Sequence, residues 1–110
     1  MKILKLTLSK KPFEVMVTGE KTDEFRKFSK WIESRMFEKN GHWKRYDFVH
    51  FTWGYGKDRP YFIAKYFGAT KVTNEVECDK FIYSNGLKVQ VCIGDFIIHL
   101  GDIIEIGNYQ

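Results

Sequence analysis

The N-terminal segment alternates apolar and polar side chains from Ile3 to Leu8, which predicts a half-buried strand. The period then changes to that of a helix, with an apolar stripe made of Phe13, Met16 and Val17. Ser9 precedes the stripe as an N-cap, and Pro12 falls in the first turn, where its missing N–H is harmless. Gly19 stands where a helix commonly ends with a left-handed residue.

A second strand and a second helix are expected next. If residues 22–26 are extended, Thr22, Glu24 and Arg26 share one face of the strand because side chains alternate. Ser29 is a second N-cap, and residues 30–38 have the pattern of a helix. This helix would form a basic wall beside the strand, cover an open end of the barrel, or do both.

The middle of the chain is rich in strand patterns. Both faces of Tyr46–Trp53 are partly apolar, which indicates a central strand covered on two sides. Tyr61–Thr73 predicts a long strand with a bend at Gly68. A further short strand is expected around Glu75–Cys78.

The C-terminal third predicts a hairpin and more short strands. Phe81–Val89 carries Asn85-Gly86, a favoured two-residue hairpin turn. Further strands are expected at Leu87–Ile93, Phe96–Leu100 and Ile103–Ile106. Short strands at this spacing predict a small barrel. The expected fold is therefore α+β, a single domain over residues 1–110 with a small mixed β-barrel and two flanking helices.

Composition and charge narrow the function classes. A hydrophobic content of 44% with 17% aromatic residues argues against disorder. No apolar run is long enough to span a membrane, and the first residues lack the apolar core of a signal peptide, so a cytoplasmic protein is expected. Residues 1–45 contain twelve Lys or Arg against six Asp or Glu, whereas residues 46–110 contain six against eight. This asymmetry favours an anionic partner such as nucleic acid, although a solvated helix surface explains it equally well.

The cysteines and histidines do not have the spacing of a metal site. Cys78 and Cys92 form no C-x-x-C pair, and His42, His50 and His99 are scattered. We therefore expect no metal and no cofactor, and we interpret the two cysteines as reduced core residues.

The candidate chemistry lies in residues 19–26, Gly-Glu-Lys-Thr-Asp-Glu-Phe-Arg. Glu24 and Arg26 would fix each other's orientation, with Lys21 at the entrance to a cleft. The stretch fits G-x-K-x-x-E-x-R and resembles the signature of ASCH domains, which have the PUA-like fold. The match covers about the first quarter of the chain. The resemblance implies a PUA-like barrel whose cleft binds RNA or modified nucleosides.

The first functional hypothesis is RNA or nucleotide binding. Lys21 and Arg26 would engage phosphate or a base edge, and Glu24 would orient Arg26 or accept a hydrogen bond from an exocyclic amine. Aromatic side chains among basic residues can stack unpaired bases. The full predicted binding set is Lys21, Thr22, Glu24, Arg26, Lys27, Lys30 and Arg35, with Trp53 and Tyr55 as the stacking pair.

The second hypothesis is a hydrolase with Lys21 and Glu24 as catalytic residues. Some ASCH-like amidohydrolases of acetylated cytidine have the pattern G-x-K-T-x-T-x-R. This chain has Glu24 in place of the nucleophilic Thr, and a carboxylate cannot replace an activated hydroxyl in acyl transfer without changing the mechanism. A ribonuclease scheme remains open, with Lys21 stabilising charge on a phosphate and Glu24 or a histidine as base.

The third hypothesis is a protein-interaction role, as an inhibitor or adaptor of the phage or mobile-element type. Trp31, Met36 and Trp43 would then be interface anchors instead of core residues.

Overall fold

The computed structural model describes residues 1–73 and 79–109, so the strand predicted around Glu75–Cys78 lies outside the described residues. Seven strands and two helices are present in this part of the chain. In order they are β1 (Ile3–Leu8), α1 (Lys10–Val17), β2 (Asp23–Arg26), α2 (Lys30–Met36), β3 (Phe48–Trp53), β4 (Tyr61–Lys71), β5 (Asp79–Ile82), β6 (Lys88–Val91) and β7 (Phe96–Gly107). The predicted α+β class is confirmed.

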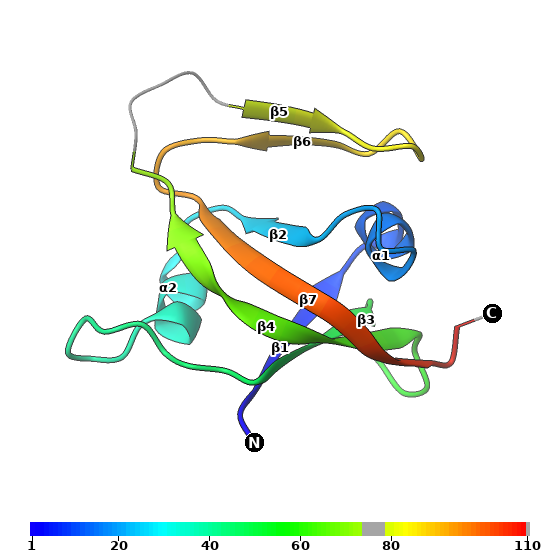
Figure 1. Ribbon diagram of the computed structural model, residues 1–110, viewed down its shortest axis with the longest axis horizontal. Coiled ribbons are helices and arrows are strands. Elements are labelled where there is room, and N and C mark those ends of the chain that lie inside the picture. Colours follow the sequence, from blue (N-terminus) through cyan, green and yellow to red (C-terminus); the bar gives the residue numbers. More distant parts are fainter. Residues whose placement is uncertain (74–78, 110) are drawn as a thin grey trace.

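Five of the strands form one strongly curled mixed sheet, a half-barrel, in the order β1-β3-β4-β7-β2 (Figure 1). Only the β1–β3 pair is parallel within this sheet. β3 lies between β1 and β4, so its predicted central position in the sheet is confirmed. β5 and β6 form a separate hairpin that lies beyond β2 (Figure 1). The two edge strands of the sheet are therefore β1 and β2, whose side chains line the site described below.

A single apolar cluster joins the sheet to both helices. Its buried members are Leu4, Leu6, Leu8, Phe13, Met16, Ile32, Met36, Val49, Phe51, Phe62, Ala64, Phe96 and Ile98. α1 contributes Phe13 and Met16, two of the three residues of its predicted stripe, and α2 contributes Ile32 and Met36. The core thus fixes both helices against the sheet by apolar burial, which is the dominant favourable contribution to folding.

The helix ends agree with the predicted capping residues, with two differences. Gly19 has a φ of +87°, as expected after the C-terminus of α1. Ser29 caps α2, since its hydroxyl accepts a hydrogen bond from the Ile32 N–H at 3.1 Å. Ser9 has the extended backbone of an N-cap, but its side chain makes no capping hydrogen bond. α2 ends at Met36, before residue 38, because the next residue is extended.

The predicted hairpin is confirmed, with a longer turn than expected. Tyr83 N–H donates to Leu87 O at 2.9 Å, so three residues, 84–86, form the loop. The two-residue turn typical of Asn-Gly needs a positive φ at both residues. Here Gly86 has a φ of +84°, whereas Asn85 does not have a positive φ.

The long strands accommodate their glycines by shifting register. Gly68 in β4 has a φ of +97° and lies where the β4–β7 pairing shifts between Tyr66 and Ala69, so the predicted bend coincides with a bulge. β7 runs unbroken through Gly101-Asp102, and the two strands predicted there are one.

The structure also bears on the predicted state of the cysteines and on membrane-spanning helices. Cys92 is half-buried and disulfide-bonded, so its interpretation as a reduced core residue is wrong. Cys78 lies outside the described residues. Within residues 1–73 and 79–109, no helix has the length and apolar character needed to cross a bilayer.

Candidate functional site

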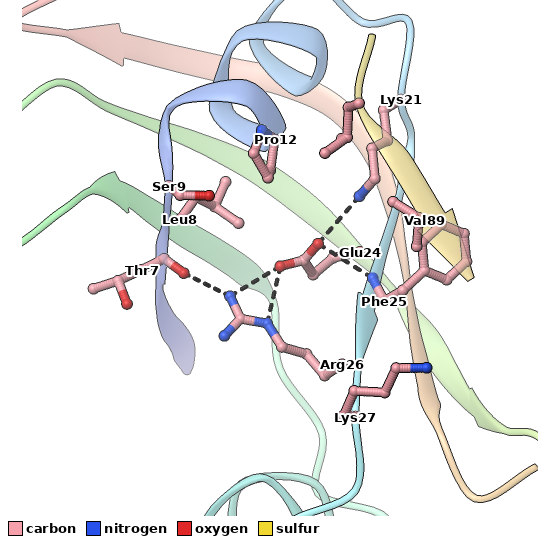
Figure 2. Close-up of a pocket in the computed structure, with 11 residues that line it drawn as sticks. Thr7, Leu8, Ser9, Pro12, Lys21, Glu24, Phe25, Arg26, Lys27 and Val89 are labelled. Carbon is pink, nitrogen blue, oxygen red and sulfur yellow. Dashed lines mark hydrogen bonds and ion pairs between the residues drawn. The ribbon is translucent and has the colours of Figure 1, made fainter. Parts of the chain in front are cut away.

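A pocket of about 320 Å³ lies between the N-terminal end of α1, strand β2 and strand β6 (Figure 2). Its lining residues are Thr7, Leu8, Ser9, Pro12, Lys21, Glu24, Phe25, Arg26, Lys27, Leu87 and Val89. Four of the predicted site residues are among them: Lys21, Glu24, Arg26 and Lys27. The volume lies at the lower end of the range for small-molecule sites, roughly 300–1,000 Å³.

Lys21 is buried instead of standing free at the entrance. Its side chain is 1% exposed, and its Nζ donates to Glu24 Oε1 at 3.1 Å and to Asp23 O at 2.5 Å. The third neighbour is Met16 Sδ at 3.7 Å. The ammonium also lies 5.0 Å from the centroid of the Phe25 ring. All three N–H donors therefore have partners inside the protein, and Lys21 acts on the site through Glu24.

Glu24 is the centre of the charged cluster. Its side chain is 6% exposed, and Oε1 accepts from Lys21 Nζ at 3.1 Å and from Phe25 N–H at 3.2 Å. Oε2 lies 2.9 Å from both Nε and Nη2 of Arg26. A carboxylate offers about four lone-pair sites, so three hydrogen bonds and one further ion-pair contact use most of its acceptor capacity.

Arg26 connects the two edge strands of the half-barrel. Besides its contacts with Glu24, its Nη2 donates to Thr7 O on β1 at 2.7 Å (Figure 2). The side chain is 24% exposed, and the second terminal nitrogen, Nη1, makes no hydrogen bond among the described residues. The sequence predicted the Glu24–Arg26 pair correctly, because residues two apart on a strand share a face.

Lys27 forms part of the rim. Its Nζ donates to Asp95 Oδ2 at 2.6 Å and to Gln90 O at 2.8 Å, while 66% of its side chain stays exposed. Asp95 is buried and also accepts from the Cys92 N–H at 2.8 Å. Lys27 therefore fastens β2 to the β6–β7 connection and still reaches solvent.

The β5–β6 hairpin supplies the wall opposite α1 and is anchored at several points. Ser84 donates to the Glu20 carboxylate from its N–H at 2.8 Å and from its hydroxyl, and these bonds lower the pKa of Glu20. Asn85 Nδ2 donates to Lys11 O at 2.9 Å. The Phe25 and Phe81 rings stack at 5.3 Å. The sequence predicts the hairpin but not its place over β2, because these contacts join residues far apart in the chain.

Three predicted binding residues lie away from the pocket. Thr22 is exposed and lines a separate pocket near Gly101, so it does not join Glu24 and Arg26. Lys30 and Arg35 are exposed on α2, and the Arg35 guanidinium lies 4.9 Å from the Trp31 ring centroid. The two α2 residues belong to the basic surface that the sequence predicts beside the motif.

The predicted stacking pair divides between two environments. Trp53 is half-buried, 6.0 Å from the Phe13 ring, and the Arg59 guanidinium lies 5.6 Å from its ring centroid. Tyr55 is exposed, and its hydroxyl accepts from Thr7 Oγ1 at 3.3 Å. Tyr55 is not among the pocket-lining residues but contacts one of them, Thr7, whereas Trp53 packs against the core.

One hydrogen-bonded chain on the sheet has no counterpart in the sequence analysis. His99 Nδ1 lies 2.9 Å from Asp23 Oδ1, and His99 Nε2 lies 2.9 Å from Thr70 Oγ1. Asp23 and His99 face each other directly in the β2–β7 ladder. Cross-strand pairing of neighbours accounts for this arrangement.

The pocket lining also includes residues that carry no sequence signal of function, among them Ser9, Pro12 and the hairpin residues Leu87 and Val89.

No family model, no curated protein and no solved structure matches the chain. The resemblance to ASCH domains therefore rests on the motif in residues 19–26.

Proposed function

We propose that the protein binds single-stranded nucleic acid, with RNA as the first candidate, or a modified nucleoside, as an ASCH-like domain with a PUA-like fold would. The observation that carries the proposal is the Arg26 guanidinium at the pocket, held on one side by Glu24 and on the other by Thr7 O. A side chain already fixed in place loses little conformational entropy on binding. Its planar donor group suits phosphates and base edges.

The exposed basic side chains that follow the motif along the chain support the same proposal. Lys27 lies on the rim, and Lys30 and Arg35 follow on α2, all exposed to solvent. Phe28 and Trp31, within the same stretch, each expose about half of their area. In single-stranded nucleic-acid binding, exposed aromatic rings stack on the bases and cations neutralise the phosphate backbone. We assign the stacking role to these two rings and to the exposed Tyr55, because Trp53 packs against the core.

The hydrolase alternative receives less support from the geometry. A general base needs an available lone pair, and the Glu24 carboxylate already accepts three hydrogen bonds within the protein. Lys21 has no exposed ammonium with which to meet a phosphate. Thr22, the hydroxyl nearest to the nucleophile position of the amidohydrolase pattern, lines the other pocket.

The protein-interaction alternative loses one of its three anchors. Met36 is fully buried in the core, while Trp31 and Trp43 are partly exposed. The Trp43 ring packs on Phe37 at 4.2 Å.

The test is fluorescence anisotropy of labelled single-stranded RNA at two salt concentrations with the wild-type protein, Arg26→Gln and Arg45→Gln. Arg45 is exposed and lies outside the pocket, so its variant matches the change in charge and chemistry. We expect Arg26→Gln to weaken binding by roughly tenfold or more and Arg45→Gln to have little effect. Salt should weaken the wild-type complex because bound phosphates release counterions. Absence of binding at low salt, or equal affinity of both variants in folded protein, would contradict the proposal.

A further inference from the structure

We infer that the group held in the pocket is a phosphate and not the edge of a base. This inference rests on the proposed function, since it specifies which part of a nucleic acid or nucleotide the Arg26 pocket recognises. Two properties of the pocket lining support the inference: the hydrogen-bonding groups that have no partner among the described residues, and the net charge of the lining.

The acceptors of the charged cluster are already in use. Glu24 accepts three hydrogen bonds, from Lys21 Nζ, Phe25 N–H and Arg26 Nε, and Arg26 Nη2 lies 2.9 Å from the same carboxylate as an ion-pair contact. Thr7 O on the opposite wall accepts from Arg26 Nη2. An exocyclic amine of a base would have to compete with these donors for the remaining lone pairs, and any donor or buried charge that it displaced would be left without a partner at a high cost.

The remaining groups at the pocket are mainly donors. Arg26 Nη1 makes no hydrogen bond among the described residues, and the Ser9 hydroxyl is also without one there. Lys27 uses two of its three N–H groups, on Asp95 and Gln90. Figure 2 shows Ser9 across from Arg26, while the Lys27 side chain extends away from the Arg26 guanidinium. A ligand rich in acceptors is therefore favoured over one that must donate.

The charge selects among acceptor-rich ligands. The lining contains three cations, Lys21, Arg26 and Lys27, against the single carboxylate of Glu24. When Asp95, which binds Lys27, is counted as well, three cations stand against two carboxylates, and one positive charge is in excess. A neutral base with carbonyl oxygens gains nothing from that excess, whereas a phosphate makes charge-assisted hydrogen bonds to a guanidinium.

The first experiment titrates inorganic phosphate into the isotope-labelled full chain and follows backbone and Arg Nε–H signals by NMR. A chloride titration at matched ionic strength is the control. We expect phosphate to shift the signals of Ser9, Phe25, Arg26 and Lys27 and to leave Arg45 unchanged. Lys27→Gln should weaken phosphate binding severalfold, while Lys65→Gln, at an exposed site on β4, should not.

The second experiment measures RNA binding with and without phosphate as competitor, using short RNAs whose ends carry a 5′-phosphate, a 3′-phosphate or hydroxyls only. Displacement of RNA by phosphate supports the inference. A terminal phosphate that raises affinity roughly tenfold identifies the strand end as its source, and equal affinities identify an internal phosphate.

Two outcomes separate this inference from the proposed function. If RNA and free nucleosides shift the pocket signals but phosphate does not, the inference is overturned and RNA binding stands. If phosphate binds at the pocket but no RNA does, the proposed function fails and the pocket belongs to a smaller phosphorylated ligand.

Discussion

The buried charge cluster gives the most direct test of how the motif is built. The perturbation is Lys21→Met, which keeps a long unbranched side chain and removes the ammonium. The side chains of Lys21 and Glu24 are 1% and 6% exposed, so this pair belongs with buried ion pairs and not with solvent-screened ones. We expect the free energy of unfolding to fall because Glu24 loses a charged partner.

The magnitude follows from what Glu24 keeps. Removing one partner of a buried pair costs about 3–5 kcal/mol when the other charge is left uncompensated. Glu24 retains Arg26 and the Phe25 N–H after Lys21→Met, so we expect about 2–3 kcal/mol. Glu24→Gln leaves the Lys21 ammonium buried without an anion and should cost about 3–5 kcal/mol. The double variant should cost less than the sum, with a coupling of about 1–2 kcal/mol.

The assay is equilibrium urea unfolding of the wild type, both single variants and the double variant. Lys65→Met, at an exposed lysine on β4, controls for the loss of a lysine as such. A domain of this size has about 5–15 kcal/mol of stability, so the expected losses are measurable. The reasoning is refuted if Lys21→Met lies within about 0.5 kcal/mol of Lys65→Met and the two single effects add.

Two further predictions concern the helices and the sheet. Ser29→Ala should lower the unfolding free energy by about 1 kcal/mol, because it removes the cap on the Ile32 N–H, while Ser9→Ala should change it far less. Equal losses in urea unfolding would refute this. Burial, followed by the nearby Tyr46, raises the pKa of Tyr66 from 10.0 to about 12. Because this pKa is higher in the folded state, the stability it contributes is complete below pH 10 and is lost as the pH rises towards 12. Tyr66→Phe should therefore flatten the alkaline loss of stability and remove a late step from the phenolate absorbance titration; an unchanged titration would contradict it.

The sequence predicted those parts of the fold that depend on local patterns. β1, α1 and the β5–β6 hairpin were found because alternation, capping residues and a turn glycine act over a few residues. The turn length was wrong, because Asn85 has the negative φ of a three-residue loop instead of the positive φ of a two-residue turn. Gly101-Asp102 predicts a break between two strands, but a register shift against β4 lets β7 continue. Such shifts depend on the partner strand, which a single sequence does not specify.

The candidate site was predictable only where it is local. Glu24 and Arg26 pair because they lie two apart on one strand. The burial of Lys21 requires Phe25 and the hairpin residue Tyr83, whose ring lies 5.9 Å from the ammonium, and the hairpin's position over β2 has no sequence signal. The bond from Arg26 to Thr7 likewise depends on how far the sheet curls. Residue types and spacing therefore located the motif, whereas burial and long-range contacts decided what each residue does.

These contacts divide the motif into a support and a functional group. Gly19 ends α1, Lys21 fixes Glu24, and Glu24 fixes Arg26, so three of the four motif residues serve to place the fourth. Arg26 alone combines a bond across the two edge strands with an N–H group that is free among the described residues. Substitution of any support residue will therefore change stability and binding together. Binding measurements on Lys21 or Glu24 variants consequently report on the fold as well. The ligand is best examined with the wild-type protein and with variants of Lys27, because the Lys27 side chain remains largely in solvent.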